Sequence, residues 1–313
     1  MLPPAYIGDM RGQPVVEVVS LTKRFGSVVA VDDLSFTVGP GQVVGLLGPN
    51  GAGKTTALRM LLGLIRADGG SATILGERIR PGSPVLKRVG ALVEGPGFVP
   101  HVSGRRNLEL YWRAGGADVT SAHIDDALAL SGLGDAVERK VKTYSHGMRQ
   151  RLGFAQALLG RPELLLLDEP VNGLDPQQIV EVREALLRLA SAGTTILLSS
   201  HLLAEVEQTC GFVVVLDRGR LVRAGTVAEI TAGSDSAYLE VDDTQRAWEL
   251  LGTVPGIRAK EAAPPNGIIV HLEGAARSDL VAALVAAGIR VETVMARRNL
   301  EDAFLEMTGR SGL

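Results

Sequence analysis

The segment GPNGAGKT at residues 48–55 restricts the fold of this chain more than any other feature of the sequence. It follows the short apolar run VVGLL at residues 43–47 and opens a stretch of helical composition. The spacing matches G-x-x-x-x-G-K-[ST], a strand-to-helix loop whose glycines let backbone N–H groups face phosphate oxygens. An incidental glycine turn followed by Lys-Thr is the alternative, and the strand–helix context disfavours it.

The loop also predicts which side chains contact a nucleotide. Lys54 would reach the β- and γ-phosphates of ATP, and the hydroxyl of Thr55 would bind Mg²⁺. The predicted ATP-binding residues of this segment are Gly48, Pro49, Asn50, Gly51, Ala52, Gly53, Lys54, Thr55 and Thr56.

Composition and length limit the remaining possibilities. The chain has 313 residues, enough for about two domains. Its net charge of −3 implies no strong polyanion partner, so we expect no nucleic acid, and a compact basic patch is still compatible with this charge. Its one cysteine, Cys210, excludes an internal disulfide and is typical of a reducing compartment. No apolar run approaches the roughly 18 residues of a spanning helix, and the N-terminal segment lacks a signal-peptide core. We therefore expect that the chain does not cross a membrane by itself.

Short apolar strands alternate with helices along most of the chain, which predicts an α/β fold with a largely parallel sheet buried on both faces. Helical spacing and glycine breaks over about residues 95–145 predict a small helical subdomain inside this domain. A polar link near residues 232–236 precedes a βαββαβ order plus a final helix over 237–313. That order predicts a small α+β C-terminal domain of ferredoxin-like type.

In the segment LLLLDEP an apolar strand ends with the two acidic residues Asp168 and Glu169, and a histidine follows the apolar run ILLSS. At the carboxyl edge of a parallel sheet, Asp168 would orient the metal through water and Glu169 would act as general base. A helix cap or a surface salt bridge is the alternative for the two carboxylates. His201 lies just past its strand and could donate to the γ-phosphate, although a lone histidine is more often structural.

The segment YSHGMRQRLGFAQALLGRPELLLLDEP, together with NGLDP and SSHLLAEVE, resembles the nucleotide-binding subunits of ABC transporters. The resemblance covers residues 15–232 and places the ATP-binding domain at 14–232. It implies a P-loop NTPase fold of the ABC type, with a mixed sheet core, an antiparallel β subdomain and a helical subdomain. It further implies an adenine-stacking role for Phe25, a signature that contacts ATP bound to a second subunit, and a D-loop containing Asp175. The signature residues would be Ser145, His146, Gly147 and Met148.

Two positions depart from the pattern of that family. The signature reads YSHGM where LSGGQ is usual, so His146 replaces a glycine and Met148 a glutamine. His146 is either simply tolerated or modulates the dimer contact. Glu94 stands where a glutamine is usual, and we expect it to retain a role at the metal and the attacking water. A glutamate here is similar to the ATPases of lantibiotic and bacitracin export systems. A coincidence of register is the alternative.

The resemblance implies an ATPase that works as a homodimer, or paired with a similar ATPase, on separate permease subunits at the cytoplasmic face of the membrane. The C-terminal stretch NLEDAFLEMTGR is similar to the tail of drug- and antibiotic-exporting ATPases. An antibiotic, an antimicrobial peptide or another amphiphile is then the expected cargo. An importer ATPase, a soluble ABC-type ATPase acting on ribosomes or DNA, and a P-loop kinase are the alternatives. His271, alone on a predicted strand, is expected to be structural.

Overall fold

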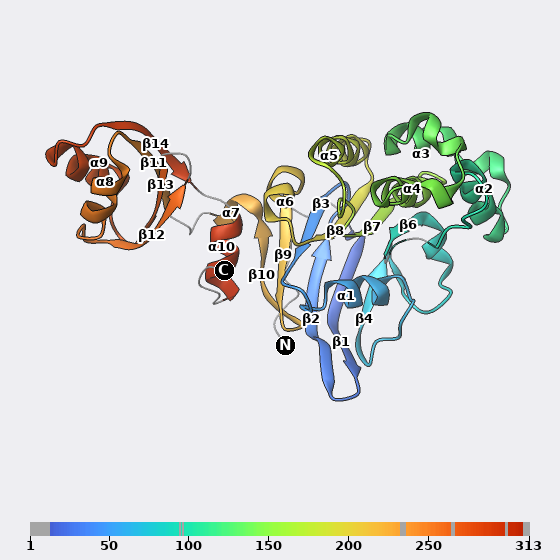
Figure 1. Cartoon of the computed structure of the whole chain (residues 1–313). Coiled ribbons are helices and arrows are strands. Elements are labelled where there is room, and N and C mark those ends of the chain that lie inside the picture. The colour runs from blue at the N-terminus through green and yellow to red at the C-terminus, as the bar shows by residue number, and fades with distance from the viewer. Residues whose placement is uncertain are drawn as a thin grey trace. The chain divides into compact units, whose positions relative to one another are not determined.

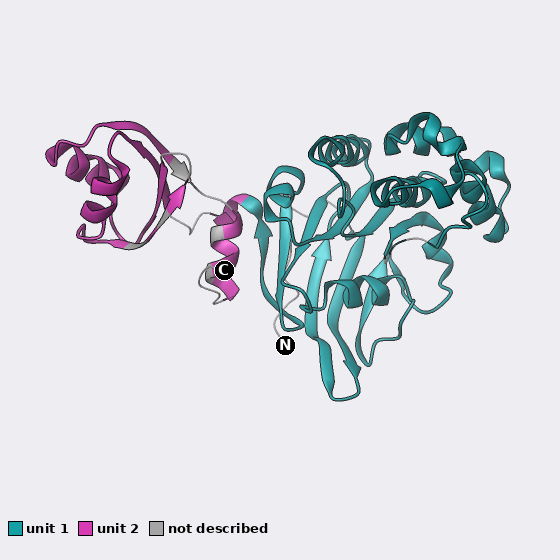
Figure 2. Cartoon of the chain, in the orientation of Figure 1, with its two compact units in different colours: residues 1–227 teal, residues 228–313 magenta. Residues whose placement is uncertain are grey.

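The computed structural model describes residues 13–93, 95, 97–231, 236–263, 267–297 and 300–308. The chain divides into two compact units, Met1–Val227 and Ala228–Leu313 (Figures 1 and 2). This boundary lies shortly before the predicted link, most of which falls on 232–235, outside the described residues. No helix of the described residues is long and apolar enough to span a lipid bilayer.

An antiparallel sheet opens the first unit, in the strand order β2-β1-β4-β5. Its strands are β1 (Val16–Phe25), β2 (Val28–Val38), β4 (Gly69–Ile74) and β5 (Glu77–Arg78). The hairpin between β1 and β2 turns at Gly26, whose φ of 58° is accessible to glycine without strain. The alternating burial of β1 shows that one face of this sheet packs on the core.

A second sheet of six strands, in the order β10-β9-β3-β8-β7-β6, forms the centre of the unit. All neighbouring strands are parallel except the β9–β10 pair, which is antiparallel. Its parallel strands therefore end at a common edge, where ligands of such sheets bind. The strands are β3 (Val43–Leu47), β6 (Val89–Leu92), β7 (Leu164–Asp168), β8 (Thr195–Ser200), β9 (Phe212–Asp217) and β10 (Arg220–Thr226).

Helices cover both faces of the six-stranded sheet. Helix α1 (Lys54–Leu61) shares one apolar core with both sheets, which buries Leu58 and Leu61. On the other face α6 (Leu203–Thr209) packs so closely on β3 that a methyl group at Gly45 would lie 2.7 Å from Val206. Helix α5 (Pro176–Ser191) contacts β8, and Figure 1 shows it beside α6.

Local backbone contacts set two helix ends. Helix α1 ends at Leu61, because Gly63 has a φ of 66° and donates its N–H to the carbonyl of Met60. Helix α6 begins at Leu203, because the N–H of Leu202 donates to the hydroxyl of Ser200.

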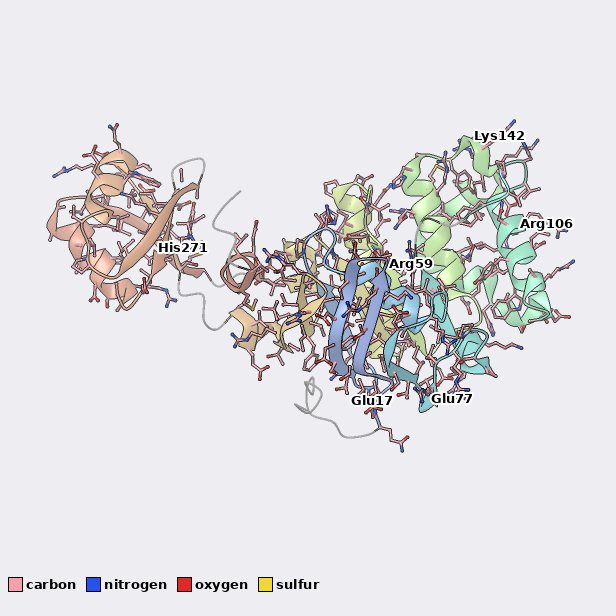
Figure 3. All side chains as sticks on the ribbon, turned by 90° about the horizontal axis from the view of Figure 1, so that it is seen from below. Glu17, Arg59, Glu77, Arg106, Lys142 and His271 are labelled. Carbon is pink, nitrogen blue, oxygen red and sulfur yellow. The ribbon has the colours of Figure 1, made fainter. Side chains whose placement is uncertain are left out.

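The predicted helical subdomain occupies the stretch between β6 and β7. Its elements are α2 (Gly104–Ala114), η2 (Val119–Ala122), α3 (Ile124–Ser131), η3 (Gly134–Glu138), η4 (Val141–Thr143) and α4 (His146–Leu158), and η1 (Pro84–Arg88) precedes β6. Figure 3 shows Arg106 and Lys142 on this subdomain and Glu17 and Glu77 on the antiparallel sheet. The subdomain is fixed to the sheet through α4, which contacts β6.

The second unit has its own apolar core and an antiparallel sheet of order β12-β13-β11-β14. From β11 onward the elements follow the predicted order βαββαβ plus a final helix, and the ferredoxin-like type of this unit stays a prediction. His271 lies buried on β13 (Figure 3). The elements are α7 (Val227–Thr231), β11 (Ser236–Val241), α8 (Thr244–Leu251), β12 (Ile257–Ala263), β13 (Gly267–Leu272), α9 (Arg277–Ala286), β14 (Val291–Arg297) and α10 (Leu300–Thr308).

Candidate functional site

The phosphate loop lies between β3 and α1 and is packed so closely that two of its glycines are obligatory. A methyl group at Gly48 would lie 2.5 Å from the carbonyl oxygen of Leu216. Gly53 has a φ of 100° and sits against the carbonyl of Ala30 on β2. Side chains at either position would clash with backbone, so the sequence can close the loop here only with glycine.

Lys54 is held inside this loop. Its ammonium group donates to the carbonyl oxygens of Gly48, at 2.6 Å, and Pro49, at 3.2 Å. Burial lowers the pKa of Lys54 below its ordinary value, while the negative charges of Glu169 and Asp168 act in the opposite direction. The first turn of α1 thus presents a buried cation beside the N–H groups of the loop.

Asp168 ends β7 beside the first turn of α1. The hydroxyl of Thr55 donates to Asp168 Oδ2 at 2.7 Å, and the hydroxyl of Ser199 donates to Asp168 Oδ1. The sheet register causes the second contact, because Asp168 and Ser199 are partners across β7 and β8. Hydroxyl and carboxylate oxygens are ligands that suit Mg²⁺. Proteins commonly bind Mg²⁺ through one or two carboxylates together with substrate phosphates and water, and the Thr55–Asp168 pair suits such a site. The described residues contain no group of three or more His, Cys, Asp or Glu side chains that could hold a metal.

Glu169 and His201 form a pair at the same sheet edge. His201 Nδ1 lies 2.7 Å from Glu169 Oε2, and the backbone N–H of His201 points at the same oxygen from 3.4 Å. The backbone of Glu169 has a φ of 49°, in the left-handed region that residues other than glycine rarely adopt. The carboxylate is therefore held at the edge of the sheet, next to the lysine and the aspartate, where it could take a proton from water.

Phe25 lies at the tip of the β1–β2 hairpin, opposite Val28. Its side chain is 48% exposed, and the ammonium of Lys23 lies 5.4 Å from the ring centroid. Because Ala30 of the same hairpin touches Gly53, the ring belongs to an element that borders the phosphate loop. An exposed ring in this place can stack on a base.

The predicted signature and D-loop lie together at the N-termini of α4 and α5. Ser145 caps α4 by accepting the N–H of Met148 at 3.2 Å, and Gly147 approaches α5 so closely that a methyl group there would lie 3.1 Å from Gln178 Oε1. The ring of His146 lies against Gly173 in the segment that precedes α5.

Asp175 caps α5 by accepting the N–H of Gln178 at 2.9 Å, in a full capping box. Gln150 connects the signature helix α4 to the backbone of the segment that carries Glu169. Its side-chain amide donates to the backbone carbonyl oxygens of Glu169 and Pro170.

Two of these contacts, those of Ser199 and Gln150, were not predicted from the sequence. These contacts depend on strand register and helix packing, which a local sequence pattern does not predict. The ILLSS run does, however, place a hydroxyl at the end of a strand. Glu94 lies outside the described residues.

The chain is similar to several known proteins. The family described as ABC transporter matches residues 31–172. The bacitracin transport ATP-binding protein BcrA of Bacillus licheniformis is 37% identical, over 94% of this chain and 97% of its own length. The daunorubicin resistance ATP-binding protein DrrA3 of Streptomyces coeruleorubidus is 38% identical, over 92% of this chain and 93% of that protein.

A solved ATP-binding subunit of an ABC transporter is 30% identical and superimposes with a TM-score of 0.63, covering 70% of this chain and 92% of that one. The likeness therefore extends from the fold to the sequence. The chain belongs to the ATP-binding subunits of ABC transporters, and it is an ATPase.

Proposed function

We propose that this chain is the ATP-hydrolysing subunit of a multisubunit exporter. It would work as a dimer, bound at the cytoplasmic face of the membrane to separate permease subunits. The observation that carries the catalytic part is the contact between Glu169 and His201 beside the Asp168–Thr55 pair. These four side chains come from β7, α1 and the end of β8, and they meet at the carboxyl edge of the parallel sheet.

Each of these groups has a role in hydrolysis. Glu169 takes a proton from the attacking water, and His201 contacts the carboxylate through Nδ1. When both ring nitrogens of His201 carry a proton, the other nitrogen donates to the γ-phosphate. Lys54 and the N–H groups of the loop stabilise charge on the transferred phosphoryl group. Mg²⁺, held by Thr55 and through water by Asp168, would supply charge neutralisation at the β- and γ-oxygens. Glu94 remains our candidate for sensing the metal and water.

The signature and the D-loop serve the second ATP site of the dimer. The hydroxyl of Ser145, the backbone of Gly147 and the N-terminus of α4 form an anion-binding end of a helix. In a head-to-tail dimer they contact the γ-phosphate bound by the other subunit, so that ATP closes the dimer and hydrolysis opens it. His146 and Met148 lie at this seam, and Phe25 stacks on the adenine.

Export is supported by two relatives, a bacitracin transport ATP-binding protein and a daunorubicin resistance ATP-binding protein. We propose an antibiotic, an antimicrobial peptide or another amphiphile as the cargo. Residues 95–115, which lead from Glu94 into α2, would transmit the state of the ATP site to the permease. Phe98 and the start of α2 lie in this segment.

The first experiment compares wild type with Glu169→Gln, by ATP turnover and by size from light scattering, with and without Mg·ATP. Removal of the base should lower kcat by at least about 100-fold, in the usual range for general-base catalysis. The variant should form a dimer only when Mg·ATP is present, because bound ATP holds the two subunits together and is no longer hydrolysed.

Glu184→Gln, the same exchange at an exposed position of α5, is the matched control. It should hydrolyse ATP as wild type does. Undiminished turnover by Glu169→Gln would rule out Glu169 as the base. A variant that stays monomeric with Mg·ATP would contradict the dimer closed by ATP alone.

A further inference from the structure

We infer that Gln150 is a positioning residue for the Glu169 carboxylate, acting through the backbone of the segment that carries it. The inference rests on the proposed role of Glu169 as general base. Gln150 lies on α4, the helix that begins at the signature, and Glu169 follows β7. The side-chain amide of Gln150 is the link between these two parts of the fold.

The contacts of Gln150 are specific and lie inside the protein. Its Nε2 donates to the carbonyl oxygen of Glu169 at 3.0 Å and to that of Pro170 at 3.1 Å. Both hydrogens of the amide are therefore used on two consecutive carbonyl groups. The residue is 9% exposed, so water cannot easily replace these bonds.

The backbone of Glu169 needs such support. Its left-handed conformation, with a φ of 49°, persists only where the surroundings impose it. Its N–H donates to the carbonyl oxygen of Ser199 at 3.2 Å, which fixes the side of the peptide facing β8. Its own carbonyl accepts from Asn172 at 3.1 Å in the following turn and from Gln150 across the fold.

Gln150 is thus the only one of these partners that approaches from the signature helix. The peptide of Glu169 is held by β8 on one side and by α4 on the other, and the direction of its carboxylate follows from that peptide. Without the α4 contact the protein still has the Glu169 carboxylate. The carboxylate is then no longer held in the orientation on which its contact with His201 depends. A misplacement of about 1 Å at a reacting group can lower a rate by about 100-fold.

The test uses Gln150→Met in the full chain, because methionine has nearly the same length and no donor. We expect kcat to fall by about 10- to 100-fold, while the affinity for a fluorescent ATP analogue stays within about threefold of wild type. Gln150→Glu, which keeps the shape but offers acceptors only, should show the same split between kcat and affinity. Gln156→Met, on the same helix, should keep wild-type kcat and controls for the exchange itself.

The combination with Glu169→Gln separates positioning from a general structural role. If Gln150 acts through the carboxylate, Gln150→Met should lower the residual turnover of Glu169→Gln by less than about twofold. The double variant should also still form the ATP-dependent dimer that the proposed function requires.

An equal loss of rate in the presence and in the absence of the Glu169 carboxylate would overturn the inference. Wild-type kcat in either folded variant at Gln150 would overturn it as well. Neither result would contradict the proposed function, which fails instead if Glu169→Gln retains the turnover of wild type.

Discussion

At the scale of single residues, the charge of Lys54 makes ATP affinity depend on pH. Burial holds the pKa of Lys54 below the ordinary value of 10.5 in the nucleotide-free protein. Bound phosphates favour the charged ammonium, so binding raises this pKa and takes up protons. The affinity for ATP should therefore fall as the pH rises through the lowered pKa of the free protein, starting below 10.5.

Titration calorimetry of ATP binding between pH 7 and 10, in two buffers of different ionisation enthalpy, measures both the affinity and the proton uptake. Lys54→Met is the matched control. It should bind ATP more weakly, and its binding should take up no protons in this pH range. Proton release by wild type in the same range would show that phosphate does not raise the pKa of Lys54.

The residues of the site differ in how far the sequence predicts them. Lys54 and Thr55 belong to one contiguous segment, and their mutual geometry follows from the loop itself. Asp168 and Glu169 follow an apolar strand, so a strand pattern is enough to place them at the sheet edge. The role of Ser199 depends instead on the register between β7 and β8, and that of Gln150 on the packing of α4 against the segment after β7. Both contacts join residues that are far apart in the sequence.

At the scale of secondary-structure elements, the packing of α4 on β6 depends on Gly90. A methyl group at Gly90 would collide with the carbonyl of Ala157 in the last turns of α4 and would lie 2.7 Å from Leu165 on β7. Backbone on one side and a buried strand on the other leave no room for relaxation. Gly90→Ala should therefore destabilise the first unit by roughly 1–3 kcal/mol, which corresponds to a fall in Tm of about 2–10 °C.

Thermal unfolding followed by circular dichroism checks this expectation. Gly211→Ala is the matched control, because a methyl group at Gly211 meets no atom within 4 Å, and its Tm should differ from wild type by about 1 °C at most. Equal melting temperatures for the two variants would mean that α4 can move away from β6 without cost.

Element types were easier to predict than element ends. The alternation of apolar runs and helical stretches predicted the parallel sheet, and the structure confirms it. The end of α1 at Leu61 depends on the left-handed conformation of Gly63. A glycine can adopt this conformation without strain, but the sequence alone does not show that it does so. The close approach of α4 to β6 had no sequence signal beyond a glycine within a strand.

At the scale of the whole molecule, the two units have separate apolar cores. The core of the first unit joins both sheets to α1, and the core of the second lies between its own sheet and the helices α8 and α9. All the site residues that the structure describes, from Phe25 to His201, belong to the first unit. Nucleotide binding should therefore not require the second.

A truncated chain that ends at Thr231, the last residue of α7, tests this independence. It should bind a fluorescent ATP analogue with an affinity within about threefold of the full chain, because every described contact at the phosphate loop is retained. Its calorimetric unfolding should lack the heat absorbed by the second core, at roughly 0.7 kcal/mol for each residue removed.

The companion variant Lys54→Met in the truncated chain controls for nonspecific binding of the analogue, because its affinity should be weaker, as in the full chain. A truncated chain that unfolds cooperatively but loses affinity would place a nucleotide-binding contribution in the second unit. A truncated chain that fails to unfold cooperatively would show that the core of the first unit is incomplete without residues beyond 231. Separate cores make retained affinity the expected result, since a domain with its own core can fold alone.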